Sequence, residues 1–401
     1  MMSTINMMNI LDTDSTYDNV GPQDPPIRLV ISVQPKLVQT VINRNEKIVV
    51  YEIQVSNAQN APLRIHAIRS VFDVKCTIIN KIVSGNELKE IYAPISAQAG
   101  SSPNDTLLPP SETGIFFMYW TFPKKQCLNG SITNTLYLQV ENEPETLQSI
   151  VTKPICIEDK YIIISPPLRG DKWYCTNGLA RTSRHRTGKI IVDGLLWFPE
   201  TYAIDFLQYG KYGLFSGDGS RNEDWYCYGA LIYSVSFGTV VHVKTGIPDN
   251  KPGERIEVVT EDTISGNCIV VKLDCNNYAV YAHMISDSIR VKVGDKVKDG
   301  QVLGKLGNSG VSDAAHLHFE ILRENRVIDG PPAAYGFDRY LEYEYVPSDQ
   351  DDQPANVEVV GQTIRCEQIP LDRDLVKFWP DKVDKCENLG KSSLFNLNDV
   401  Y

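Results

Sequence analysis

The stretch HLHFEI at residues 316–321 decides the fold class, because its polar and apolar residues alternate. Successive side chains of a β-strand point to opposite faces of the sheet. His316 and His318 are therefore expected to face one space, and the three apolar residues of the stretch to face a hydrophobic core. Imidazole is the commonest metal ligand in proteins. The stretch predicts a strand with a metal site on one side.

A third histidine lies in a similar apolar run. His283 occurs in YAHM at residues 281–284, so three of the six histidines fall within residues 283–318. A single histidine in a strand is more often a hydrogen-bonded structural residue than a ligand. Two titratable rings side by side in a half-buried strand need compensation that a structural role rarely supplies. The paired histidines therefore favour site chemistry.

The composition excludes several classes of protein. A chain of 401 residues is long enough for two domains, and its net charge of −11 argues against nucleic-acid binding, which needs a basic surface. No apolar run approaches the length of a membrane span, and no signal peptide is visible. Nine cysteines without C-x-x-C spacing favour free thiols over a disulfide framework.

Four segments differ in character, and β-structure is expected in all but the first. Residues 1–26 are polar and are predicted to form a disordered arm. Residues 27–157 contain short alternating strands with Pro- and Asn-rich turns, which predict an immunoglobulin-like β-sandwich. Residues 158–347 have longer apolar strands punctuated by glycines, and residues 348–401 read as an acidic linker, short strands and a tail. The predicted fold class is mainly β.

The order of four motifs in the third segment resembles that of a known family. YAH at 281–283, VKVGDKV at 291–297, GNSG at 307–310 and AHLHF at 315–319 follow one another as in the M23, or LytM/lysostaphin, family of zinc metallopeptidases. The resemblance extends over residues 175–332. It implies an antiparallel sheet domain with an open groove.

The resemblance also implies roles for individual residues. Members of this family bind Zn²⁺ through the His and Asp of an H-x-x-x-D motif and through the second His of H-x-H. YAIDF at residues 202–206 matches the Asp segment, so Asp205 and His318 correspond to two metal ligands. His316 and His283 correspond to the histidines that assist catalysis in the family.

The chain departs from the family at the first zinc ligand. Thr201 occupies the position four residues before Asp205, where the family has histidine. A catalytic zinc normally takes three protein ligands, and a threonine hydroxyl is too weakly acidic to replace an imidazole. Thr201 is expected to share a strand face with Asp205, whereas the neighbouring Glu200, a weaker candidate ligand, is expected on the opposite face.

Another histidine is available as the third ligand. His185 lies in SRHR at residues 183–186, ahead of the Asp205 strand. If this segment folds over the site, an Asp/His/His set is complete. Otherwise His185, flanked by two arginines, is an exposed loop residue. Both interpretations are open from the sequence.

Three functions follow from these alternatives. A complete site implies a zinc-dependent endopeptidase that cuts peptidoglycan peptides or similar peptide bonds with a metal-activated water. An incomplete site implies a degenerate M23 domain that binds peptide or peptidoglycan or activates a partner. In the third interpretation the sandwich makes an unrelated carbohydrate or protein contact. The family acts outside the bacterial cytoplasm, so a periplasmic or secreted location is expected, although the free thiols favour a reducing compartment.

Overall fold

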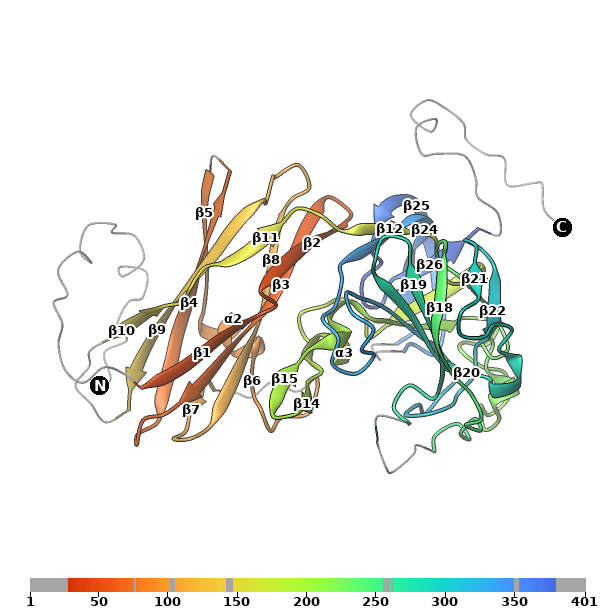
Figure 1. Ribbon diagram of the computed structural model, residues 1–401, viewed down its shortest axis with the longest axis horizontal. Coiled ribbons are helices and arrows are strands. Elements are labelled where there is room, and N and C mark those ends of the chain that lie inside the picture. The colour runs from red at the N-terminus through yellow and green to blue at the C-terminus, as the bar shows by residue number, and fades with distance from the viewer. Residues whose placement is uncertain are drawn as a thin grey trace.

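The computed structural model describes residues 28–379 except 76, 101–104, 142–146, 255–259, 261–262 and 350–352 (Figure 1). The predicted arm at 1–26 and the end of the chain from residue 380 lie outside the described residues. Strands dominate the rest, and the helices are short: α2 (Gly85–Glu90), α3 (Arg184–Thr187) and the 3₁₀ helices η1 (Pro199–Tyr202), η2 (Asn222–Asp224) and η3 (Ser286–Ser288). The mainly β class predicted from the sequence is confirmed. None of the described helices has the length and apolar character that a membrane crossing needs.

The first eleven strands form one continuous sheet, here called the N-terminal sheet. Its order is β5-β4-β9-β11-β2-β3-β8-β6, with β1, β10 and β7 paired to β3, β9 and β4. Only the pairing of β11 with β2 is parallel. The strands are β1 (Leu29–Gln34), β2 (Leu37–Asn43), β3 (Glu46–Asn57), β4 (Leu63–Val74), β5 (Thr77–Ser84), β6 (Tyr92–Pro94), β7 (Leu107–Leu108), β8 (Thr113–Pro123), β9 (Gly130–Val140), β10 (Gln148–Val151) and β11 (Ile155–Glu158).

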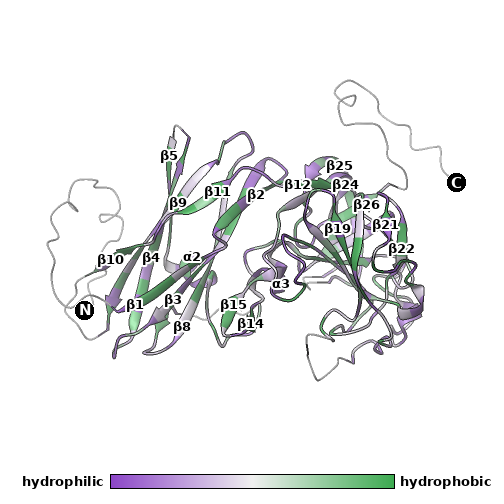
Figure 2. Cartoon of the chain, in the orientation of Figure 1, coloured by the Kyte–Doolittle hydropathy of each residue, from purple (hydrophilic) through white to green (hydrophobic). Residues whose placement is uncertain are grey.

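Alternating side chains build the core of this sheet. Leu136, Leu138 and Val140 of β9 are buried in one hydrophobic cluster, as their spacing predicts, and Figure 2 shows hydrophobic and hydrophilic patches alternating along the long strands. Phe72 of β4 and Phe122 of β8 meet in the same cluster with ring centroids 4.8 Å apart. The two halves of the sheet therefore enclose a shared core. The immunoglobulin-like assignment stays a prediction.

Strand β3 is buried on both faces. Tyr51 and Ile53 pack into the core of the N-terminal sheet. Ile48 and Val50 instead pack with residues of the second half of the chain, such as Tyr202. One face of β3 is thus an interface rather than a solvated surface, and the two halves of the chain share buried contacts.

The second half of the chain forms another large sheet, the C-terminal sheet. Its order is β12-β24-β26-β13-β16-β23-β20-β19-β18-β21, with β25 paired to β24. Strands β25 and β26, which lie in the segment predicted to hold an acidic linker, short strands and a tail, both pair with β24. The strands are β12 (Ile162–Ile164), β13 (Gly170–Thr176), β16 (Ile204–Gln208), β18 (Gly238–Lys244), β19 (Asn267–Leu273), β20 (Tyr278–Met284), β21 (Lys296–Val297), β23 (Leu317–Leu322), β24 (Tyr335–Pro347), β25 (Val357–Gln368) and β26 (Leu375–Phe378).

Two small two-stranded sheets complete the described structure. β14 (Ile190–Val192) pairs with β15 (Leu195–Trp197), and β17 (Leu231–Tyr233) pairs with β22 (Val302–Lys305). In Figure 1, α3, β14 and β15 lie between the two large sheets. The connection from β13 to β16 is therefore an excursion toward the N-terminal sheet.

The middle of the C-terminal sheet positions the candidate site. Strands β16, β23 and β20 are neighbours, and their register places Asp205 opposite His318 and His318 opposite Ala282. Leu317 and Phe319 of β23 point into the core, so His318 points to the other face. Strand alternation and register thus bring together residues more than a hundred positions apart in the sequence.

The cysteines fit the expected predominance of free thiols. The free cysteines are Cys127, Cys156, Cys175, Cys227, Cys268 and Cys275, whereas Cys366 is disulfide-bonded. The other two, Cys76 and Cys386, lie outside the described residues.

Candidate metal centre

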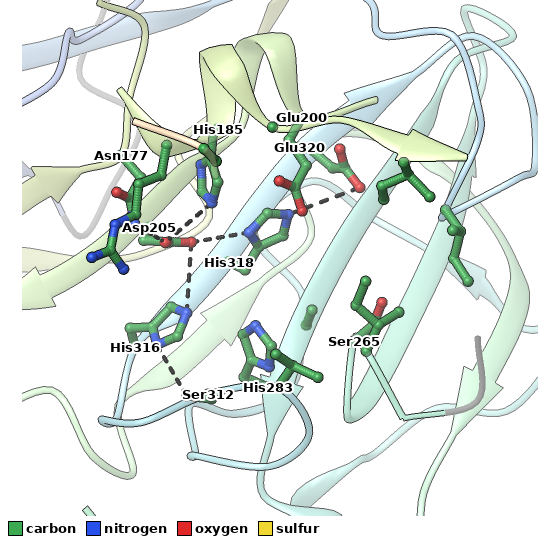
Figure 3. Close-up of a pocket in the computed structure, with 18 of the residues that line it drawn as sticks. Asn177, His185, Glu200, Asp205, Ser265, His283, Ser312, His316, His318 and Glu320 are labelled. Carbon is green, nitrogen blue, oxygen red and sulfur yellow. Dashed lines mark hydrogen bonds and ion pairs between the residues drawn. The ribbon is translucent and has the colours of Figure 1, made fainter. Parts of the chain in front are cut away.

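A groove of about 630 Å³ lies over the strand face that carries His318. Its floor comes from β16, β23 and the end of β20, and its walls come from α3, η1 and the loop before β23 (Figure 3). All the site residues predicted from the sequence line it: His185, Asp205, His283, His316 and His318, together with Glu200.

Three of these residues form a compact set of possible metal ligands. One donor atom from each of His185, Asp205 and His318 lies within 4.8 Å of the other two. His185 Nε2 is 3.2 Å from Asp205 Oδ2, and His318 Nδ1 is 3.0 Å from Asp205 Oδ1. The three residues are only 8%, 6% and 8% exposed. Two imidazoles and a carboxylate match the donor set of a catalytic zinc with three protein ligands.

The Asp205 carboxylate is ionised at the centre of this set. Burial raises its pKa, but the charges and hydrogen bonds of the surrounding histidines, His185 first, outweigh burial and hold the pKa well below its ordinary value. Asn177, which directly follows β13, also donates from Nδ2 to Asp205 Oδ2 at 2.8 Å. Asp205 is therefore fixed in place with one carboxylate oxygen toward each of the two histidines.

His185 is not an exposed loop residue, so that interpretation of the sequence is wrong. It lies in α3, buried over the groove. Its Nδ1–H donates to the carbonyl of Ala203 at 3.3 Å, which leaves Nε2 facing Asp205. Burial lowers the pKa of His185, but the Asp205 charge outweighs burial and raises the pKa above its ordinary value. A ring nitrogen held by a backbone carbonyl is the usual arrangement for a metal-binding histidine.

The expectations for Thr201 and Glu200 are also wrong. Both lie in η1, a 3₁₀ helix begun by Pro199, and not on the strand of Asp205, which starts at Ile204. The Thr201 hydroxyl donates to the carbonyl of Phe198 at 2.9 Å. Glu200 lines the groove instead of facing away from it. Both expectations assumed that side chains alternate between the two faces of a strand, and this alternation does not apply in a 3₁₀ helix.

His318 has a second partner on its outer side. Its Nε2 is 3.9 Å from Glu320 Oε1, and Glu320 is 3% exposed with no hydrogen-bond partner for Oε2. Burial lowers the pKa of His318, but Asp205 and then Glu320 outweigh it and raise the pKa well above its ordinary value. Sequence reasoning missed Glu320, although its position two residues after His318 on one strand was a usable signal.

His283 and His316 lie beside each other at the edge of the set. Their ring centroids are 4.6 Å apart, and His316 Nε2 is 3.6 Å from Asp205 Oδ1. Backbone carbonyls fix both rings: the Nδ1–H of His283 donates to Ser309 at 2.7 Å and that of His316 to Ala314 at 2.8 Å. In each ring Nε2 is therefore the nitrogen left without a proton in the neutral form.

The backbone around His283 has two unusual features. Its backbone has a φ of +60°, which is uncommon for a residue other than glycine. The Ser309 carbonyl that accepts from its ring directly precedes Gly310. A Cβ added to Gly310 would lie 2.3 Å from the backbone nitrogen of Gly266, so this position requires glycine.

Burial, followed by the nearby charges of His316 and His318, lowers the pKa of His283 well below its ordinary value. His283 is therefore neutral at neutral pH.

Comparison with known proteins finds a family match that covers part of this site. Residues 224–330 match the family model described as peptidase family M23. This part of the chain belongs to peptidase family M23. The M23 segment includes His283, His316 and His318, whereas His185 and Asp205 lie before its first residue.

Individual relatives are each similar to about a quarter of the chain. An uncharacterized metalloprotease of Buchnera aphidicola subsp. Baizongia pistaciae is 38% identical over 101 residues, which are 25% of this chain and 22% of that protein. The peptidoglycan DD-endopeptidase ShyB of Vibrio cholerae is 34% identical over 97 residues, or 24% of this chain and 22% of ShyB. The catalytic domain of lysostaphin from Staphylococcus simulans aligns with 28% identity, a TM-score of 0.18 and coverage of 28% of this chain and 75% of that domain. The chain thus spans about a fifth of the length of the two relatives named first.

Proposed function

We propose that the chain is a zinc-dependent endopeptidase whose metal is held by His185, Asp205 and His318. The observation that supports this most strongly is the convergence of three buried donors from three separate segments to within 4.8 Å. Three buried polar groups of this kind, one of them an ionised carboxylate, are expensive to assemble without a role. His185 then takes the place of the histidine that is missing at position 201.

The residues present fit a zinc ion. His185 offers Nε2 because Nδ1 donates to a carbonyl, and His318 offers Nδ1 toward the same point as Asp205. With Nδ1 of His318 used as ligand, its remaining proton is on Nε2, which faces the Glu320 carboxylate at 3.9 Å. A bound Zn²⁺ supplies a Lewis acid that acidifies a water molecule and polarises the scissile carbonyl.

His316 and His283 supply proton transfer and charge stabilisation in this proposal. In its neutral form each ring presents an unprotonated Nε2, because its Nδ1–H is engaged by a carbonyl. Nε2 of either ring is suited to accept the proton of the attacking water. Once protonated, the ring donates a hydrogen bond to the oxyanion that develops on the peptide carbonyl and can pass its proton to the leaving amine. The carbonyls of Ser309 and Ala314 keep the two rings oriented for these transfers.

The proposed substrate is a peptide cross-link of bacterial peptidoglycan. Its support is the M23 membership and the similarity to ShyB, which is named as a peptidoglycan DD-endopeptidase. An open groove of about 630 Å³ is within the usual range for ligand sites. A periplasmic or secreted location follows from this substrate.

Digestion of peptidoglycan tests the proposal. Purified full-length protein loaded with Zn²⁺ is incubated with purified sacculi and with cross-linked muropeptide dimers, and the products are separated and identified by mass spectrometry. We expect dimers to be converted to monomers, the conversion to stop after the metal is removed with a chelator, and activity to return with added Zn²⁺. Cosedimentation of the zinc-loaded protein with sacculi without any new product would instead favour the degenerate binding module.

A further inference from the structure

The helix that carries His185 is too short to hold itself in place. α3 has four residues, and a single turn of helix is unstable without tertiary contacts. Within its own segment it has the Ser183 cap, whose hydroxyl accepts from the Arg186 backbone N–H at 3.3 Å. On the side of the C-terminal sheet, His185 donates to Ala203 at 3.3 Å. The position of His185 therefore depends on what else fixes α3.

Arg186, the next residue, is anchored in the N-terminal sheet. Its side chain is 0% exposed, and its guanidinium donates to Glu52, which is 2% exposed on β3. The second terminal nitrogen donates to the carbonyls of Tyr51 at 3.2 Å and Met118 at 3.0 Å. The guanidinium carbon also lies 5.3 Å from the ring centroid of Phe117. A planar guanidinium held by a fork of acceptors has little freedom to move.

The end of α3 and the segment after it contact strand β8 of the same sheet and the connection between its strands β6 and β7. Thr187 Oγ1 accepts from the backbone N–H of Gly100 at 2.7 Å, and Lys189 Nζ donates to the carbonyl of Ala97. Phe198 packs edge-on against Phe117 with centroids 5.7 Å apart. The adjoining Gln98 and Ala99 line the groove itself. The N-terminal sheet thus supplies an anchor for α3, and the connection between its strands β6 and β7 supplies part of the groove wall.

We infer that the N-terminal sheet is a structural part of the candidate metal centre, and that the buried Arg186–Glu52 pair positions His185 for metal binding. The inference rests on the proposed role of His185 as ligand. Arg186 and Glu52 are positioning residues, because neither lines the groove. Glu52 lies on the face of β3 that points away from the core of the N-terminal sheet, whereas its neighbours Tyr51 and Ile53 point into that core. Glu52 therefore does not contribute to packing within the N-terminal sheet.

The test measures Zn²⁺ affinity of the full-length protein by competition with a chromophoric chelator. The variants are Glu52→Gln, His185→Ala and the two combined. Glu52→Gln is expected to weaken zinc binding about tenfold or more, because α3 loses its charged anchor and His185 is no longer held in place; loss of contacts that orient a metal ligand typically has effects of about this size. In the His185→Ala background, Glu52→Gln is expected to have no further effect, because its influence passes through His185. The Co²⁺-loaded Glu52→Gln protein is expected to show the ligand-field absorption of His185→Ala.

Arg44→Gln is the matched control. Arg44 joins the turn between β2 and β3 to the C-terminal sheet through Glu342, 2.7 Å away, and Asp374, 3.2 Å away, without contacting α3. This change also removes an ion pair between the two sheets, but zinc affinity is expected to stay within about twofold of the unmodified protein. A loss of affinity as large as that of Glu52→Gln would indicate a general effect of loosening the two sheets and would overturn the inference.

The remaining outcomes separate the inference from the proposed function. Removing one partner of a buried ion pair is strongly destabilising, so Arg186→Lys, which keeps the cation but not the fork, replaces Glu52→Gln if the latter does not fold. If His185→Ala weakens zinc binding but Glu52→Gln and Arg186→Lys do not, the inference is wrong and the proposed function stands. If the unmodified protein binds no zinc, both are wrong.

Discussion

His318→Ala is expected to lower zinc affinity by more than about 100-fold and to abolish cleavage of cross-linked muropeptides. Loss of an outer partner alone reduces metal affinity by roughly 10–100-fold, and His318 is proposed to contact the metal itself. The change also leaves Asp205 without its 3.0 Å partner. Zinc affinity is measured by chelator competition, and cleavage by chromatography of the products.

Two further substitutions make this expectation specific. His242 is an exposed histidine on β18, outside the groove, so His242→Ala is expected to leave zinc affinity and cleavage unchanged. Thr201→Val keeps the shape of the residue and removes a hydroxyl that donates to Phe198, so only a stability loss of about 1 kcal/mol is expected. Zinc affinity that depended on Thr201 more than on His185 would contradict the proposed ligand set.

His316→Ala and His283→Ala are expected to separate catalysis from metal binding. Each variant should bind zinc within several-fold of the unmodified protein, because all three proposed ligands remain. Cleavage should fall by roughly 10²–10⁴-fold in kcat, the usual contribution of a general acid or base. The kcat of the double variant is expected to be only slightly lower than that of the less active single variant. The reason is that the two rings, with centroids 4.6 Å apart, act on the same water and carbonyl.

The measurements are kcat and KM on muropeptide dimers, zinc stoichiometry, and far-UV circular dichroism to establish folding. His316→Gln and His283→Gln serve as conservative partners, since an amide keeps hydrogen bonding but cannot transfer a proton near neutral pH. Full activity in any of these variants would remove that histidine from the proposed mechanism. Loss of zinc in parallel with loss of activity would make the residue part of the metal set instead.

Local patterns predicted the floor of the groove well. The alternation of residues 316–321 placed His316 and His318 on the groove side and the apolar residues in the core, as found. Asp205 and His283 were identified through motif order, and the register of β16, β23 and β20 brings them to His318. These features depend on a few consecutive residues or on a recognised order of motifs.

The surroundings of His185 were beyond reach of the sequence for a physical reason. Arg184 and Arg186 on either side of it indicate an exposed loop. Arg186 is nevertheless buried and pairs with Glu52, a residue 134 positions earlier in the chain. Only the tertiary contact between the two sheets reveals this. Thr201 was misplaced for a local reason, because Pro199 begins a 3₁₀ turn in a segment that otherwise continues the strand pattern.

Diffraction from zinc-soaked crystals at the zinc absorption edge tests the central claim most directly. The expected result is a single strong anomalous peak in the groove, about 2.0–2.2 Å from His185 Nε2, an Asp205 carboxylate oxygen and His318 Nδ1. An absence of any peak within reach of these three atoms, or a peak bound by Asp205 and His318 with His185 turned away, would contradict the account.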